Sequence, residues 1–197
     1  KTFCDLVQID SPSGEEESVA QDLTRRLKQL GLKVQLDDYG NVIANDGGDN
    51  PVTLSAHMDT VEPGRGIKPS VEDDRILSDG TTILGGDCKA GVAAILEAVE
   101  SILEDNTPHG SIEIVLTREE EIGLVGARNL DMSLLKGKEV VVFDGEGPPC
   151  ADTVVHAQKP VSFFSYEFIL GFAHGYDKLA ALRTLGRRVH CCQAYGG

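Results

Sequence analysis

The segment Val52-Thr53-Leu54-Ser55-Ala56, continued by His57-Met58-Asp59, decides the fold. It joins a short, mostly apolar run, typical of a buried strand, directly to polar side chains that can bind metals or move protons. Similar strands are predicted at 112–116 and 140–143, and acidic residues follow each of them. A helix predicted over 89–103 lies between the first strand and the second. Strands that alternate with helices predict an α/β layer fold.

Another helix is predicted nearer the start of the chain, over residues 15–29, because apolar residues recur every four positions from Val19 to Leu27. Ser13 is its expected N-cap, and Glu16, three residues later, would complete a capping box. Two short extended segments complete the expected pattern, at 33–36 and 41–43.

The charge balance excludes some classes of function. The chain has 18 Lys and Arg against 32 Asp and Glu, a net charge of −14, so it lacks the basic clusters that a nucleic-acid partner requires. No apolar run approaches the roughly 18 residues of a membrane helix. Five cysteines without a CxxC pair argue against a disulfide framework and a thiolate zinc site. This cysteine pattern predicts a reducing, cytoplasmic setting.

The composition changes near residue 150. The last 47 residues hold seven of the ten Phe and Tyr and carry a net charge of +2, whereas the first 150 residues carry −16. We therefore predict two parts, a body over 1–150 and a divergent tail over 151–197.

Four polar clusters follow apolar runs, at the ends of predicted strands where open α/β sheets bind their ligands. They are His57-Met58-Asp59, Gly86-Asp87-Cys88-Lys89, Glu119-Glu120-Glu121 and Asp144-Gly145-Glu146. Carboxylates packed together raise one another's pKa, and a bound cation removes this penalty. Imidazole with carboxylates favours zinc, manganese or cobalt over calcium or magnesium.

Each cluster taken alone has a simpler interpretation. His57 would be a satisfied strand-end histidine, Asp59 a cap of the next turn and Asp87 an N-cap of the following helix. The acidic run 119–121 would be a solvated surface. The recurrence of all four clusters after apolar runs favours the metal site.

Four segments in order carry a family resemblance: 55–61 (SAHMDTV), 78–91 (SDGTTILGGDCKAG), 117–127 (TREEEIGLVGA) and 143–147 (FDGEG). They resemble the co-catalytic zinc metallopeptidases, which include peptidase T, carboxypeptidase G and acetylornithine deacetylase. The likeness is greatest to the peptidase T branch, the tripeptide aminopeptidases. It implies that residues 1–150 are the N-terminal part of a truncated zinc exopeptidase-like catalytic domain, a mixed β-sheet flanked by helices. The tail, 151–197, has two interpretations: a remnant of the lid domain, or a frameshifted or otherwise abnormal ending.

The resemblance implies a metal-binding role for four residues. His57, Asp87 and Asp144 match the ligands of a first zinc ion, and Asp87 also matches the carboxylate that bridges to a second. Glu121 matches a ligand of that second ion. We therefore expect two zinc ions per chain, with manganese or cobalt as alternatives. The family's last ligand, a histidine, is not recognisable here, so the second site is expected to be incomplete.

The resemblance also implies two catalytic roles. Asp59 matches the acid that orients the ligand histidine, and Glu120 matches the general base. Glu119, the first residue of the acidic run 119–121, is then expected to be exposed to solvent and to have no role in the site. Cys88 stands where the peptidase T branch usually has an aspartate, at a position that is not an expected ligand.

The implied function is that of a zinc-dependent exopeptidase that hydrolyses short peptides with metal-activated water. An N-acyl amino acid deacetylase is the nearest variant. The alternative is an inactive metal-binding fragment or pseudoenzyme of the same family, whose exposed apolar surface would favour association into oligomers. A nucleotide-binding domain is disfavoured, because residues 85–91 lack the phosphate-loop spacing.

Overall fold

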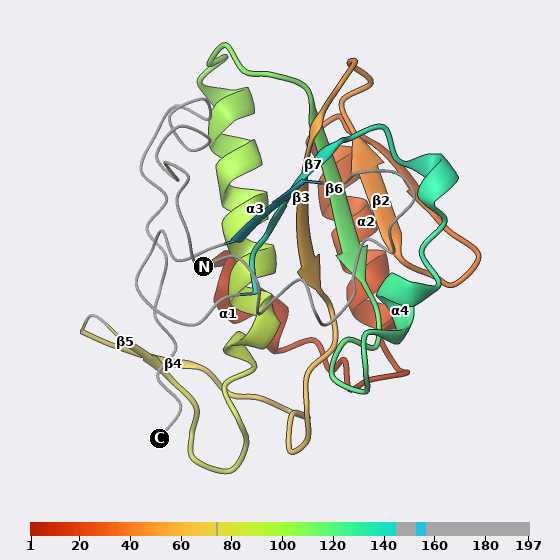
Figure 1. Cartoon of the computed structure of the whole chain (residues 1–197). Coiled ribbons are helices and arrows are strands. Elements are labelled where there is room, and N and C mark those ends of the chain that lie inside the picture. Colours follow the sequence, from red (N-terminus) through yellow and green to blue (C-terminus); the bar gives the residue numbers. More distant parts are fainter. Residues whose placement is uncertain (74, 145–152, 157–197) are drawn as a thin grey trace.

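The computed structural model describes residues 1–73, 75–144 and 153–156 (Figure 1). The helices are α1 (Thr2–Val7), α2 (Glu17–Gln29), α3 (Gly86–Glu104) and α4 (Val125–Arg128), with a 3-10 turn, η1 (Met132–Leu134). The strands are β1 (Lys33–Leu36), β2 (Val42–Asn45), β3 (Val52–His57), β4 (Ser70–Glu72), β5 (Arg75–Leu77), β6 (Ile112–Thr117), β7 (Glu139–Val142) and β8 (Thr153–His156). Most of the tail, 157–197, lies outside the described residues.

Six of the strands form one mixed sheet in the order β1-β2-β6-β3-β7-β8. The central strands β6, β3 and β7 are parallel, whereas β1 pairs with β2, β2 with β6 and β7 with β8 in antiparallel fashion. The expected α/β fold with a mixed sheet and flanking helices is thus confirmed. Because the three parallel strands point the same way, their carboxyl ends meet at one edge of the sheet.

Alternation along the strands assigns side chains to the two faces of the sheet. In β6, Ile112, Ile114 and Leu116 enter the larger core, while Val115 enters a smaller cluster on the other face. The larger core also contains the buried side chains of α1, α2 and α3, and Figure 1 shows the long helix α3 running beside the parallel strands. The three helices therefore pack against the sheet whose strand ends carry the polar clusters.

The predicted strands agree with the observed ones to within a few residues, and 33–36 is reproduced at both ends. Helix α3 begins at Gly86, three residues earlier than predicted, but Asp87 and Cys88 inside it have non-helical backbone angles. The β4–β5 hairpin, a separate two-stranded sheet, was not expected from the sequence.

The predicted capping box at the start of α2 is wrong. The helix begins at Glu17, and Glu16 occupies the N-cap position without any side-chain capping bond. The Ser13 hydroxyl instead donates a hydrogen bond to Asp59, and the Glu16 carboxylate accepts one from the Arg118 side chain. Long-range partners have replaced the local cap because both side chains point toward the strand ends rather than along the helix.

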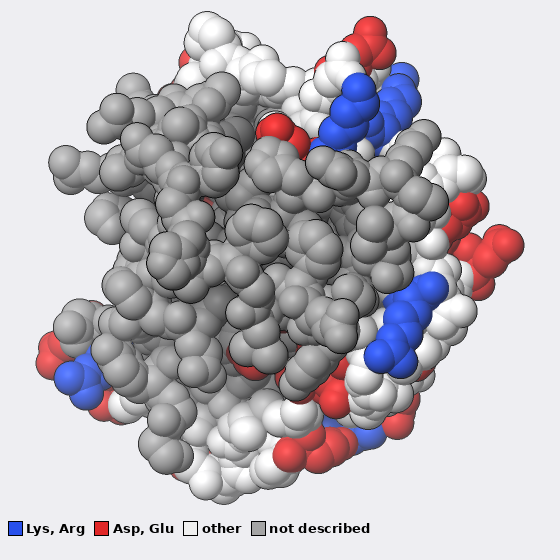
Figure 2. Space-filling model, in the orientation of Figure 1, with Lys and Arg blue, Asp and Glu red and all other residues white. Residues whose placement is uncertain are grey.

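In the part of the chain that the structure describes, no helix combines the length and apolar character needed to cross a membrane. On the face drawn in Figure 2, basic side chains of the described part lie in separate groups rather than in a continuous stripe.

Candidate metal centre

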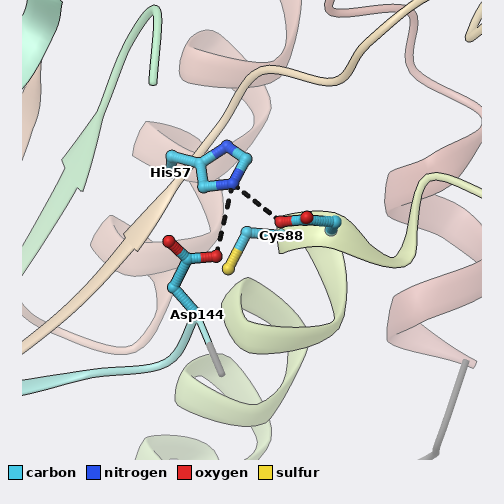
Figure 3. A group of neighbouring side chains, drawn as sticks. His57, Cys88 and Asp144 are labelled. Carbon is cyan, nitrogen blue, oxygen red and sulfur yellow. Dashed lines mark hydrogen bonds and ion pairs between the residues drawn. The ribbon is translucent and has the colours of Figure 1, made fainter. Parts of the chain in front are cut away.

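His57 ends β3 and lies at the centre of the candidate site. Its side chain is only 2% exposed, and its Nε2 atom lies 3.0 Å from Asp87 Oδ1 and 3.6 Å from Asp144 Oδ1. Asp87 comes from the first turn of α3 and Asp144 directly follows β7. Figure 3 shows the imidazole pointing toward the Asp144 carboxylate. The structure therefore brings the three predicted ligands of the first ion to one point.

Asp59 joins this imidazole to the acidic turn after β6. The Asp59 side chain is fully buried, and Oδ1 lies 3.2 Å from His57 Nδ1. The backbone N–H groups of Glu120 and Glu121 donate to its two oxygens, at 2.9 and 3.1 Å. The Ser13 hydroxyl donates to Oδ2 at 2.7 Å. One carboxylate therefore contacts both the predicted ligand histidine and the backbone of the predicted base.

Glu120 and Glu121 form a second possible donor set with His57, in which the donor atoms all lie within 4.8 Å of one another. Glu120 Oε2 lies 4.0 Å from His57 Nε2, and a quarter of its side chain, 24%, is exposed. Such an accessible carboxylate beside the predicted ion can reach both a water and a bound substrate.

The prediction that Glu119 is merely solvated is wrong. The residue is half-buried, its carboxylate accepts a hydrogen bond from the Tyr39 hydroxyl at 2.7 Å, and its backbone has a positive φ of 51°. Its N–H donates to the buried Glu16 carboxylate. These contacts turn the backbone so that the next two residues face the site.

Sequence reasoning missed two residues that hold this turn in place. The Glu16 carboxylate is fully buried and accepts hydrogen bonds from the Arg118 side chain and from the N–H groups of Gly14 and Glu119. Arg118 also pairs with the exposed Glu17. The local spacing of Ser13 and Glu16 imitates a capping box, so only the long-range contacts identify their role.

The charges around the imidazole shift its pKa and those of its partners. Burial by itself lowers the pKa of His57, but the carboxylates of Asp144, Asp59 and Asp87 together raise it well above its usual value. Burial raises the pKa of Asp59, yet its contacts with His57 and its hydrogen-bond donors lower it to about 2. These shifts apply to the metal-free chain.

The pKa values of Glu120 and Glu121, on the turn after β6, are both raised, whereas that of Asp59 is lowered. Burial, followed by the charge of Asp87, raises the pKa of Glu121 to about 7. Burial also raises the pKa of Glu120, and the neighbouring carboxylates add to the effect. A carboxyl group with a raised pKa is suited to exchanging protons near neutral pH.

The donor set fits a divalent metal ion. Asp59, Asp87 and Asp144 surround a single imidazole, so negative charge exceeds positive charge even when His57 is protonated. A cation between His57 Nε2 and the two outer carboxylates would neutralise this excess. Nitrogen and oxygen donors of this kind suit zinc, cobalt or manganese.

Comparison with known proteins assigns this chain to a family. Residues 53–170 match the group described as Peptidase family M20/M25/M40, a stretch that contains every predicted site residue. The chain belongs to peptidase family M20/M25/M40. Within this family, peptidase T of Vibrio cholerae is 35% identical over 177 residues, covering 70% of this chain and 43% of the relative. A Bacillus subtilis protein named uncharacterized protein YqjE is 40% identical over 156 residues, covering 74% and 42%.

Solved structures agree with this placement in the M20/M25/M40 family. The crystal structure of aminopeptidase PepT from Bacillus cereus is 43% identical to this chain with a TM-score of 0.70, and a tripeptidase from Staphylococcus aureus is 40% identical with a TM-score of 0.71. Each match covers 74% of this chain and 42% of the solved one. The chain thus spans less than half the length of these relatives.

We expect the metal-free chain to lose stability as pH rises from 4.5 to 7. Glu121 has a pKa of about 7 in the folded state against 4.5 in the reference state, so the folded state holds the additional proton across this window. The stabilisation that the Glu121 proton provides is therefore complete below pH 4.5 and is lost as the pH rises through 7. The raised pKa of Glu120 lowers stability in the same direction as the pH rises. Thermal unfolding with a chelator measures this slope.

The matched control for this titration is Glu121→Gln, which should flatten the slope. Added zinc should reverse it, because the ion binds the deprotonated ligands more tightly at higher pH. A metal-free slope that is unchanged by Glu121→Gln would show that Glu121 does not cause it.

Gly91 allows α3 to approach the end of β7, next to Asp144. A Cβ at this position would lie 2.1 Å from the Phe143 carbonyl oxygen and 2.9 Å from Cys88 Sγ. Alanine favours a helix over glycine by about 1 kcal/mol, but a backbone atom at this distance cannot yield without moving the strand. We expect Gly91→Ala to lower the free energy of unfolding by about 1–3 kcal/mol.

Gly110→Ala is the control for this substitution, because a Cβ at Gly110 would have no neighbour within 4 Å. It should change the free energy of unfolding by less than about 0.5 kcal/mol. Denaturant unfolding of both variants gives the comparison, and equal stability of Gly91→Ala and the parent chain would refute the steric argument.

Proposed function

We propose that this chain is a zinc-dependent exopeptidase that hydrolyses short peptides in the manner of a tripeptide aminopeptidase. The observation that supports it most is the convergence of the His57, Asp87 and Asp144 side chains beside the Glu120–Glu121 pair. The similarity to peptidase T and to PepT aminopeptidase structures supports the substrate class. Because the chain spans less than half the length of those relatives, its activity is a proposal.

The proposed chemistry assigns one task to each group. His57, Asp87 and Asp144 would hold the first zinc ion, and Asp87 with Glu121 the second. Bound zinc supplies a Lewis acid for the scissile carbonyl and lowers the pKa of a bound water to about 7. Glu120 then takes a proton from the attacking water and passes it to the leaving amine. Asp59 keeps the imidazole and the Glu120 backbone in position through its hydrogen bonds and its contact with His57.

The test is hydrolysis of a simple tripeptide by the purified full chain after zinc addition, followed by chromatography of the products. We expect release of the N-terminal amino acid, loss of the activity with a chelator, and no activity in His57→Ala. An N-acetyl amino acid assayed in parallel separates the deacetylase from the peptidase. Hydrolysis of the acetylated compound alone would replace the proposal with the deacetylase.

A second candidate function is that of a metal-binding fragment without turnover. It is favoured by one observation: among the described residues, those that match the family's ligands give the second ion only Asp87 and Glu121. Counting bound zinc separates the candidates, since an enzyme should bind two ions per chain and an inactive fragment one. Zinc at one ion per chain without tripeptide hydrolysis would establish the second candidate.

We further propose a cytoplasmic location. Its support is the cysteine pattern, together with two described cysteines, Cys4 and Cys88, that are both free. Fractionation of the cells that produce this protein tests it, and recovery of the chain outside the cytoplasm would contradict it.

A further inference from the structure

Cys88 lies beside the first metal position without a role in the proposed reaction. It follows Asp87 in the first turn of α3 and is 3% exposed. Its thiol donates a hydrogen bond to the Phe143 carbonyl oxygen at 2.6 Å, one residue before Asp144. Figure 3 shows the sulfur atom lying close to the Asp144 carboxylate and below the imidazole. The side chain thus faces the predicted ligands and not the solvent.

The donor atoms of Cys88, His57, Asp87 and Asp144 all lie within 4.8 Å of one another. Bond lengths of about 2.0–2.3 Å place neighbouring ligand atoms of a tetrahedral zinc ion roughly 3.4–3.6 Å apart. The distances of 3.0 and 3.6 Å from His57 Nε2 to the two carboxylates are already close to this spacing. Four donors of three chemical kinds are therefore close enough together to bind one ion after small side-chain movements.

We propose that Cys88 is a fourth protein ligand of the first metal ion, bound as a thiolate. On binding, the Sγ–H bond breaks, the proton is released to solvent and a metal–sulfur bond forms, with no change of oxidation state. The sulfur turns from the Phe143 carbonyl toward the ion. A CxxC pair is not needed for this arrangement, because a single thiolate joins one imidazole and two carboxylates.

A thiolate changes which ions the site prefers. Thiolates are soft ligands that favour zinc and cadmium, whereas manganese and magnesium prefer carboxylate and water oxygens. We therefore expect this site to select zinc, cobalt(II) and cadmium over manganese. Zinc can expand to five ligands, so a fourth protein ligand still leaves a position for water. The inference rests on the proposed function only in requiring that a metal ion binds here.

Cobalt(II) binding to the metal-free full chain provides the test. We expect visible d–d absorption from bound cobalt together with an ultraviolet sulfur-to-cobalt charge-transfer band. In Cys88→Ser the d–d absorption should remain, because His57, Asp87 and Asp144 are intact, while the charge-transfer band should disappear. Manganese should compete poorly with cobalt in the parent chain and better in Cys88→Ser.

The control replaces the other four cysteines, Cys4, Cys150, Cys191 and Cys192, with serine and should retain the charge-transfer band. Three outcomes would overturn the proposal: bound cobalt without the band, a band that survives Cys88→Ser, or no cobalt binding by the parent chain. Cys88→Ala provides a second variant if Cys88→Ser fails to fold, which circular dichroism reports.

Peptide hydrolysis is a separate readout. A chain that shows the Cys88-dependent band but hydrolyses no tripeptide refutes the proposed function and keeps the ligand assignment. Hydrolysis by a chain whose bound cobalt shows no such band refutes the ligand assignment and keeps the function.

Discussion

Replacing Glu120 with glutamine should reduce tripeptide turnover about 10²–10⁴-fold while leaving zinc binding nearly intact. The amide has the shape of the carboxylate but cannot accept the proton of the attacking water. The Glu120 side chain lies beside the predicted ion but is not one of the predicted ligands His57, Asp87 and Asp144. Steady-state kinetics and zinc counts on the same sample measure both effects.

Glu121→Ala is the matched comparison, because it changes the neighbouring carboxylate on the same turn. It should lose the second ion and keep the first. Equal loss of zinc in Glu120→Gln and Glu121→Ala would contradict the assignment of base and ligand to these two residues.

Replacing Asp59 with alanine should have the largest effect on stability, because the buried carboxylate accepts hydrogen bonds from one hydroxyl and two backbone N–H groups and contacts His57. These groups would be left without a partner, at an expected loss of about 3–5 kcal/mol in the free energy of unfolding. With the imidazole no longer oriented, zinc affinity should fall about 10–100-fold. Denaturant unfolding and zinc titration provide the two measurements.

Ser13→Ala is the control, because it removes only the hydroxyl donor to Asp59. It should cost about 1 kcal/mol and leave the zinc affinity within a few fold of the parent chain. If Asp59→Ala does not fold, Asp59→Asn keeps the size of the side chain and should still weaken zinc binding. Parent-like zinc affinity in both Asp59 variants would contradict its positioning role.

Much of the fold could be predicted because the decisive signals are local. The strand at 112–116 ends one residue short of the observed β6, and its apolar residues reveal burial directly. The β4–β5 hairpin could not be predicted, since Val71 and Leu77 are exposed and give no core pattern. The beginning of α2 was misplaced because the spacing of Ser13 and Glu16 has the same appearance as a capping box.

The residues of the candidate site could be predicted from the sequence, but the long-range contacts that hold them in place could not. His57 ends β3 and Asp144 follows β7. Because these two strands are parallel neighbours, the two side chains are expected to lie close together. Contacts between residues about a hundred positions apart, such as Glu16 with the Glu119 N–H, leave no local signal. The same holds for Cys88, whose position beside the ligands depends on how α3 begins.

Zinc titration of the purified, metal-free full chain, compared with His57→Ala, tests the central claim most directly. The account predicts that the parent chain binds at least one zinc ion stoichiometrically and that His57→Ala loses this binding, because the imidazole lies between the Asp87 and Asp144 carboxylates. No stoichiometric zinc binding by the parent chain, or equal binding by His57→Ala, would contradict it.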